Sequence, residues 1–165
     1  MSKVHDALME AFAGESQANR KYLAYAKKAE AEGHPQVARL FRAVAHAETI
    51  HAHNHLRQAG EIGTTGDNLI SAVAGEHYEN TSMYPAFMKE AEEAGETRAY
   101  KSFHWANEAE KVHEVLYKEA LDNLGNPEEA FDYYVCPVCG YTHKRSAPEK
   151  CPVCGTLGSK FERIS

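Results

Sequence analysis

Acidic residues interrupt four otherwise apolar helical stripes in the first 125 residues of the chain. Apolar residues recur there at the i, i+3/i+4, i+7 spacing of a helix face that packs into a core. Each stripe nevertheless contains a glutamate, and two of these glutamates are followed three positions later by a histidine. The residues are Glu15, Glu48 with His51, Glu76, and Glu110 with His113. Burying several ionised carboxylates together without a counter-charge is too costly for a marginally stable domain. We therefore expect cations, most simply a pair of metal ions, between these side chains.

The pattern occurs twice, as a tandem repeat. The segment 11–15 is similar to 72–76, and the Glu-x-x-His pair at 48–51 recurs at 110–113. The helix ends also correspond, because 28–33 is matched by 90–95. The separation between corresponding positions is nearly constant along the chain. Two homologous helical hairpins packed face to face would bring all four stripes to one centre.

Glycine and proline divide the chain into four long helices and a small C-terminal module. The helices are expected at about residues 3–32, 35–59, 68–95 and 96–124, with stops at Gly33-His34-Pro35, Gly60, Gly95 and Gly125-Asn126-Pro127. Pro85 lies inside the third helix, where it removes a backbone donor and should bend the helix. The expected fold class is mainly α. It comprises a four-helix bundle over 1–125, a linker over 126–132 and a small domain of short β pieces and metal-binding turns over 133–165.

Glutamate and histidine at this spacing suit a metal site, because positions i and i+3 share a helix face. One helix can then give a carboxylate and an imidazole to the same site, and oxygen-rich ligation with two nitrogens favours iron or manganese. A single Glu-x-x-His pair is a weak signal, since many such pairs lie on solvated faces. Four stripes in repeat register favour the metal site.

Glu79 breaks the repeat, because Ala18 is its counterpart in the first half. It is either an exposed helix residue or a fifth carboxylate that faces the metal near His51. Oxidation of two ferrous ions would add two positive charges and favour oxygen donors. Glu79 could then replace the neutral His51.

All four cysteines of the chain lie in two Cys-Pro-Val-Cys-Gly turns, as Cys136, Cys139, Cys151 and Cys154. In a reducing compartment such pairs indicate metal ligands rather than disulfides. Zinc and iron both accept a tetrahedral site of four sulfurs, so the spacing does not choose between them. A structural zinc ribbon is one interpretation. Iron that feeds electrons to the bundle is the other, and the neighbouring di-metal pattern favours it.

Charge and hydropathy argue against several functions. The formal net charge is −6 and the basic residues form no cluster beyond Lys144-Arg145, so nucleic acid and anionic membranes are not expected partners. The chain has no apolar run near the roughly 20 residues of a membrane span, and residues 1–9 lack the apolar core of a signal peptide. We therefore expect a cytoplasmic protein. Without a glycine-rich phosphate loop, electrons should come through a partner reductase rather than directly from NAD(P)H.

The link between the second and third helices is short for a bundle in which these helices run parallel. A helix of about 25 residues is about 37 Å long, whereas the ten residues 58–67 reach at most about 33–36 Å when fully extended. Exchange of hairpins between two chains would relieve this strain. We expect a homodimer, with exchanged hairpins as one possible arrangement.

The chain resembles the rubrerythrins along nearly its whole length. The matching stretches are 13–18, 48–51, 75–79 with 83–85, 110–113 and the two cysteine turns. The resemblance implies a ferritin-like di-iron bundle with a C-terminal rubredoxin-like domain. It also implies that two iron ions and one rubredoxin-type iron are the cofactors. The di-iron ligands implied are Glu15, Glu48, Glu76, Glu110 and His113, and one iron is implied to move from His51 when reduced to Glu79 when oxidised.

Two tyrosines in such proteins lie beside the metals, and they match Tyr22 and Tyr84 here. They either supply protons or are ordinary packed tyrosines whose hydroxyls need a partner. The function implied is a non-haem di-iron peroxidase that reduces hydrogen peroxide to water, with electrons that enter through the four-cysteine iron from a reductase or rubredoxin. An oxygen reductase and a ferroxidase or iron-handling protein are the alternatives on the same bundle. A zinc-ribbon adaptor would leave the buried acids unexplained.

Overall fold

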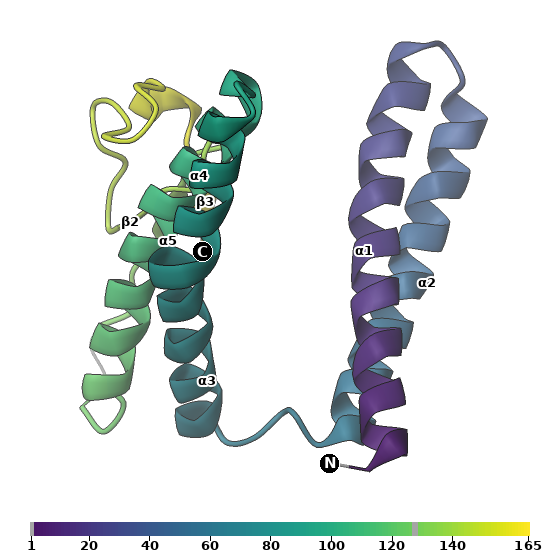
Figure 1. Ribbon diagram of the computed structural model, residues 1–165, viewed down its shortest axis with the longest axis horizontal. Helices are drawn as coiled ribbons and strands as arrows, with labels where there is room; N and C mark the ends of the chain where they lie inside the picture. The colour runs from purple at the N-terminus through teal and green to yellow at the C-terminus, as the bar shows by residue number, and fades with distance from the viewer. Residues whose placement is uncertain (1, 127–128) are drawn as a thin grey trace. The chain divides into compact units, whose positions relative to one another are not determined.

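The structure is a computed structural model that describes residues 2–126 and 129–165. The chain forms two compact units that meet in sequence at Gly63 and Thr64, and each is described by itself. The first unit is a hairpin of α1 (Lys3–Ala31) and α2 (Pro35–Ala59) (Figure 1). The second contains α3 (Thr65–Tyr78), η1 (Glu79–Met83), α4 (Tyr84–Glu93), α5 (Thr97–Asp122) and three short strands. The expected mainly α fold class with a small C-terminal β and cysteine region is confirmed.

Small residues hold the first hairpin together. Ala38, Ala45 and Ala52 recur every seven positions on α2, and all three are buried. Such short side chains let two helices approach closely. The turn between the helices uses Gly33 at φ +80°, a conformation that glycine adopts without a steric penalty, and Pro35 then begins α2.

The helix expected at 68–95 begins earlier, at Thr65, because a capping box starts it there, and a π turn interrupts its α-helical hydrogen bonding. The Thr64 side chain accepts from the Asp67 backbone N–H, and the Asp67 carboxylate accepts from the Thr64 backbone N–H. A single π-helical turn, η1, separates α3 from α4 directly before Pro85, while the expected bend stays a prediction. Within it the Tyr84 N–H donates to the Glu79 carbonyl, five residues back. Pro85, which lacks an N–H, lies in the first turn of α4, where helices tolerate proline.

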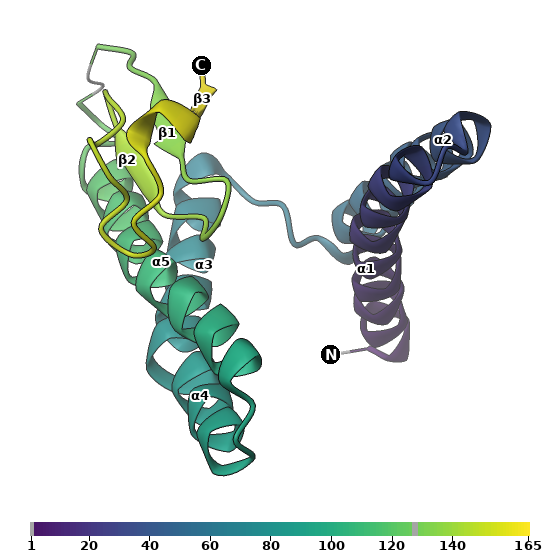
Figure 2. The same ribbon diagram turned by 90° about the horizontal axis from the view of Figure 1, so that it is seen from above.

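The C-terminal strands form a small antiparallel sheet in the order β2-β1-β3. Their bounds are β1 Tyr133–Val135, β2 Thr142–Lys144 and β3 Glu162–Ile164, with a short 3-10 helix, η2, at Gly158–Lys160. We call residues 133–165 the cysteine module. It belongs to the second unit and lies beside α5 (Figure 2).

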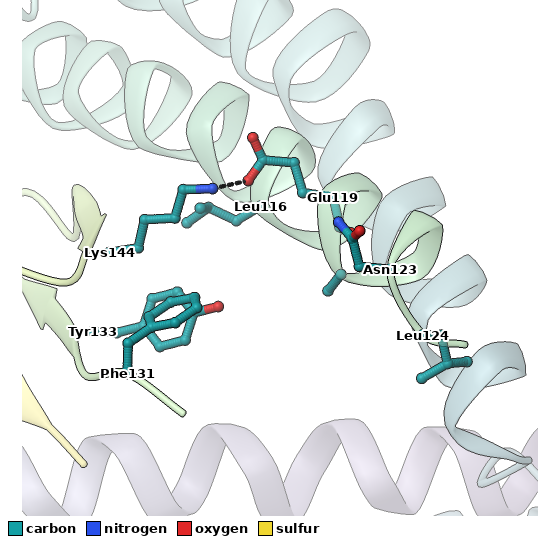
Figure 3. A pocket seen from close by; sticks show the side chains of 8 residues that line it. Leu116, Glu119, Asn123, Leu124, Phe131, Tyr133 and Lys144 are labelled. Carbon is teal, nitrogen blue, oxygen red and sulfur yellow. Dashed lines mark hydrogen bonds and ion pairs between the residues drawn. The ribbon is translucent and has the colours of Figure 1, made fainter. Parts of the chain in front are cut away.

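An ion pair fastens the cysteine module to α5. Lys144 of β2 donates to the Glu119 carboxylate of α5, at the edge of a pocket that Leu116, Phe131 and Tyr133 also line (Figure 3). The sheet and α5 are therefore joined by an ion pair at the edge of a largely apolar pocket. Part of the expected linker and the proposed stop at Pro127 lie outside the described residues. Across 2–126 and 129–165, no helix is long and apolar enough to span a membrane.

Candidate metal centres

The first hairpin brings three of the expected ligands together. Glu15 comes from α1, and Glu48 and His51 come from α2. The Nδ1 atom of His51 lies 2.8 Å from Oε2 of Glu48 and 3.7 Å from Oε1 of Glu15. We call these residues the first half-site. The His51 side chain is 53 % exposed and that of Glu48 is 15 % exposed, so the hairpin forms one wall around the group and leaves its other side open.

The second unit builds a matching group, the second half-site, from Glu76 of α3 and Glu110 and His113 of α5. The Nδ1 atom of His113 lies 2.6 Å from Oε2 of Glu110 and 3.8 Å from Oε2 of Glu76. All three side chains are partly buried. The two half-sites thus repeat one geometry, as the tandem repeat predicts.

Protons compensate part of the negative charge of these carboxylates. Burial, together with a hydrogen bond to Glu110 and the charge of that residue, raises the pKa of Glu76 to about 7. Burial also acts to raise the pKa of Glu110, but the hydrogen bond and charge of His113 outweigh it and hold this pKa below its ordinary value. The same hydrogen bond to Glu110 raises the pKa of His113. The cluster attracts positive charge, which a metal ion would supply more strongly than protons do.

His113 is oriented as a metal ligand requires. Its Nε2 atom lies 3.1 Å from the Gly140 carbonyl oxygen and 3.0 Å from Oγ1 of Thr142. A carbonyl can only accept, so Nε2 carries the hydrogen and donates it. Nδ1 faces the Glu110 carboxylate and donates to it in the metal-free protein, and loss of this proton would give Nδ1 the lone pair that a metal needs. Histidine ligands in metalloproteins are usually fixed in this way, so the residues present fit the expected ion.

Glu79 and Tyr84 lie alongside the second half-site. Burial, and then the negative charge of Glu110, raise the pKa of Glu79. Burial also raises the pKa of Tyr84, and the charges of Glu110, Glu79 and Glu76 add to the effect. Tyr22, in the first unit, packs its ring against Tyr25 and Phe41 at centroid distances of 6.3 and 6.0 Å. His51 and Glu79 belong to different units, so the expected exchange of ligands between them stays a prediction.

The four cysteines form a compact group in the cysteine module, with Cys136 and Cys151 buried and Cys139 and Cys154 partly exposed. The Sγ atoms of Cys136 and Cys154 are 3.5 Å apart, and those of Cys139 and Cys151 are 3.4 Å apart. These separations are much longer than a disulfide bond of about 2.0 Å. They approach the edge of about 3.8 Å expected for a tetrahedron with metal–sulfur bonds of about 2.3 Å.

The thiols differ in acidity because their surroundings differ. Burial raises the pKa of Cys139. Burial has the same tendency at Cys154, but hydrogen bonds from the side chain and backbone of Thr156 outweigh it and lower the pKa to about 6. Donors aimed at sulfur favour the thiolate that a metal needs.

One group of polar residues beside the second half-site was not predicted. Glu114 of α5 is buried, and its carboxylate accepts hydrogen bonds from Asn80, His77 and Lys118. Hydrogen bonds from Lys118, then Asn80 and His77, lower its pKa to about 2. A signal existed in the sequence, because Asn80 has a counterpart in Asn19, in the same repeat register that relates Glu76 to Glu15.

Comparison with known proteins identifies the family. The family model described as Rubrerythrin matches residues 6–121, and that of the rubrerythrin rubredoxin-like domain matches residues 134–162. The chain belongs to the rubrerythrin family. Like other rubrerythrins, which are generally oxidoreductases, it carries carboxylate and histidine groups for a di-iron site and four cysteines for a rubredoxin-like iron site. The expected iron cofactors are confirmed, while the assignment of individual ligands stays a prediction.

Similar rubrerythrins cover most of the chain. Rubrerythrin-2 of Clostridium acetobutylicum is 37 % identical and spans 95 % of this chain and 94 % of its own length. Nigerythrin of Nitratidesulfovibrio vulgaris is 39 % identical over 89 % of this chain and 79 % of its own length. A solved structure described as the fully reduced, all-ferrous state of nigerythrin is 36 % identical, covers 99 % of this chain and 88 % of that one, and has a TM-score of 0.61.

Proposed function

We propose that this chain is a peroxidase that reduces hydrogen peroxide to two waters with two electrons and two protons. Two ferrous ions held by the carboxylate and histidine groups would supply the two electrons. The proposed ligands are Glu15, Glu48, His51, Glu76, Glu79, Glu110 and His113. A nigerythrin has been described in an all-ferrous state, which supports a reduced form of this kind.

The protein residues would contribute position and protons. Tyr84 keeps its phenolic proton at neutral pH, since burial and nearby carboxylates raise its pKa above the ordinary value of 10.0. Its proton is thus held beside the second half-site, where a leaving oxygen would need it. Glu79 offers an additional carboxylate next to Glu110, which favours the oxidised, more positive state of the centre. Tyr22 is proposed for the corresponding role on the first half-site.

The contact of His113 with the cysteine module is the single observation that carries the proposal. One ring nitrogen of His113 faces Glu110, and the other donates to the carbonyl of Gly140, the residue that follows Cys139. A short covalent and hydrogen-bonded path therefore joins the cysteine site to the second half-site. An iron-storage protein has no need of such an inlet, whereas a reductase has. We propose that a rubredoxin or reductase delivers electrons to the cysteines.

Anaerobic stopped-flow of the fully reduced protein against peroxide and against O₂ tests the reaction. We expect oxidation by peroxide to be much the faster at equal concentrations. Faster oxidation by O₂ would instead assign the chain as an oxygen reductase, which the same groups could support. Glu79→Ala should retain iron but slow peroxide turnover.

The link between the units supports a homodimer with exchanged hairpins. Only residues 60–64 separate the end of α2 from the start of α3. The six Cα–Cα steps from Ala59 to Thr65 span at most about 22 Å, while α2, with its 25 residues, is about 37 Å long. A parallel α2 and α3 in one bundle would need a link of that length. We propose that the first half-site of one chain is completed by the second half-site of another.

A cytoplasmic location also stays a prediction, which cell fractionation would check.

A further inference from the structure

Glu114 is a buried carboxylate that the proposed peroxide chemistry does not use. Its Oε2 atom accepts from Nδ2 of Asn80 at 2.7 Å, and its Oε1 atom lies 3.0 Å from Nδ1 of His77. Lys118, one turn further along α5, compensates its charge. This carboxylate can hold Asn80 in place, because displacing Asn80 would break a charge-assisted hydrogen bond between two buried side chains.

The partners of Glu114 lie next to proposed ligands in the sequence. His77 follows Glu76, and Asn80 follows Glu79. The Asn80 side chain also donates to the Glu76 carbonyl at 2.7 Å, so it connects the last turn of α3 to Glu114. Glu114 therefore holds the backbone at the point where α3 passes into η1.

The π turn explains how Glu79 and Tyr84 come to face the same group. Residues five positions apart point about 140° away from each other on an α-helix of 3.6 residues per turn. Both Glu79 and Tyr84 nevertheless lie within electrostatic reach of Glu110. The wider π turn reduces their angular separation, so both side chains can address one site.

The first hairpin allows a comparison, because α1 corresponds to the α3–η1–α4 segment but has no counterpart of Glu114. Asn19, the counterpart of Asn80, donates to the Ala45 carbonyl at 2.6 Å and to Oγ1 of Thr49 at 2.8 Å. In the repeat register that aligns Glu110 with Glu48, the position of Glu114 is taken by Ala52. There α1 is α-helical from Lys3 to Ala31, and Ala18 stands in place of Glu79. The buried acid, the π turn and the extra carboxylate therefore occur together, in the second hairpin.

We propose that Glu114 is a positioning residue that holds the π turn through Asn80 and His77 and thereby keeps Glu79 at the metal-binding group. The inference rests on the proposed function only in giving Glu79 a role in turnover. The hold on the π turn is a property of the metal-free protein as well. Without the hydrogen bonds of Glu114, the π turn would return to α-helical geometry. The helix before the turn would then rotate by about 100° relative to the helix after it.

The test compares Glu114→Gln with Thr49→Ala, a control that removes the side-chain acceptor of Asn19 in the first hairpin. Hydrogen–deuterium exchange of the metal-free protein is followed over residues 76–84. We expect Glu114→Gln to speed exchange there at least tenfold while the far-UV spectrum is preserved, and Thr49→Ala to leave that segment unchanged. Unchanged exchange in Glu114→Gln, or a uniform increase along all of α5, would overturn the proposal. Asn80→Ala gives the same comparison should Glu114→Gln fail to fold.

Turnover of the iron-loaded protein separates this proposal from the proposed function. Glu79→Ala, Glu114→Gln and the double variant should lose peroxide turnover to the same extent, since all three remove one positioned carboxylate. Additive losses would show that Glu114 acts by another route. Normal turnover in Glu79→Ala would refute the proposed role of Glu79, and the exchange experiment would still decide whether Glu114 holds the turn.

Discussion

His113 belongs to the second half-site and also contacts the cysteine module. Its imidazole lies between the Glu110 carboxylate and the Gly140 carbonyl, and Thr142 shares the hydrogen on Nε2. Partners of this kind fix the ring and tune the metal that it binds. The Glu-x-x-His spacing predicted the carboxylate side of this arrangement. The Gly140 side could not be predicted, because it depends on how the cysteine module packs on α5.

Thr142→Val tests the outer contact of His113. The substitution keeps the shape of the side chain but removes the oxygen 3.0 Å from Nε2. We expect electron transfer from the cysteine iron to the di-iron site to slow by up to about tenfold, as measured by stopped-flow absorbance of the cysteine iron. Oxidation of the prereduced di-iron site by peroxide should change less, because the contact of His113 with Glu110 is kept. Ser146→Ala in the same module is the control, and an equal effect of both variants would contradict the expectation.

At the scale of the helices, the separation between corresponding positions of the two repeat copies carries information that hydrophobic periodicity lacks. Glu15 and Asn19 match Glu76 and Asn80 at one common separation, whereas Ala29 and Gly33 match Ala91 and Gly95 at a separation one position longer. The second copy is therefore one residue longer than the first between Asn80 and Ala91, an interval that includes most of η1. The signal for the turn is this change of separation by one residue, which corresponds to about 100° of rotation on an α-helix. Pro85 suggested a bend and gave no reason for a π turn.

Deletion of Ser82, an exposed residue of η1, should convert the α3–η1–α4 segment into one continuous α-helix. We expect helix content to be retained, because an α-helix accommodates the remaining residues without the wide turn. Glu79 and Tyr84 would then be four positions apart, at about 40° on an α-helix, and would still share a face. Peroxide turnover should therefore be largely retained. Circular dichroism, a crystal structure of the variant and a turnover assay check these statements. Deletion of Ser71, in the first turns of α3, is the control for a change of register elsewhere. A π turn that persists after removal of Ser82 would contradict the prediction.

The capping box at the start of α3 should also contribute measurable stability. Thr64→Ala removes the side-chain oxygen that accepts from the Asp67 N–H, and we expect a loss of about 1 kcal/mol in urea unfolding of the metal-free protein. Thr65→Ala, one position later, is the matched control. Hydrogen bonds from Thr64 lower the pKa of Asp67 below 3.8. The loss of stability caused by Asp67→Ala should therefore be complete above about pH 3.8, the ordinary pKa of the group. It should disappear as the pH falls through the lowered pKa. Equal losses in Thr64→Ala and Thr65→Ala would remove the capping explanation.

At the scale of the whole molecule, the sequence predicted the parts and left their assembly open. The stripes predicted both half-sites, and the cysteine spacing predicted the sulfur cluster, because each depends on residues close in sequence or in repeat register. Association of the hairpins depends on the link over 60–64 and on surfaces of more than one chain. Local periodicity contains no information on that choice.

Complementation between inactive chains tests whether hairpins are exchanged. One variant carries Glu15→Ala and Glu48→Ala, and the other carries Glu76→Ala and Glu110→Ala. Each should be inactive alone. In a co-expressed heterodimer with exchanged hairpins, one bundle receives both altered half-sites and the other receives both intact ones. We therefore expect about half of wild-type turnover per heterodimer. An inactive heterodimer that still forms, as judged by mass spectrometry, would show that each chain completes its own bundle.

The additional residue in η1 has a consequence for the history of the chain. Two hairpins that arose by duplication would at first have offered identical glutamate and histidine groups, so two ions between them would have been chemically equivalent. Glu79 stands in place of Ala18, next to the additional residue, so a fifth carboxylate lies on one side only and that equivalence is lost. One substitution and one additional residue together give the two ions different surroundings.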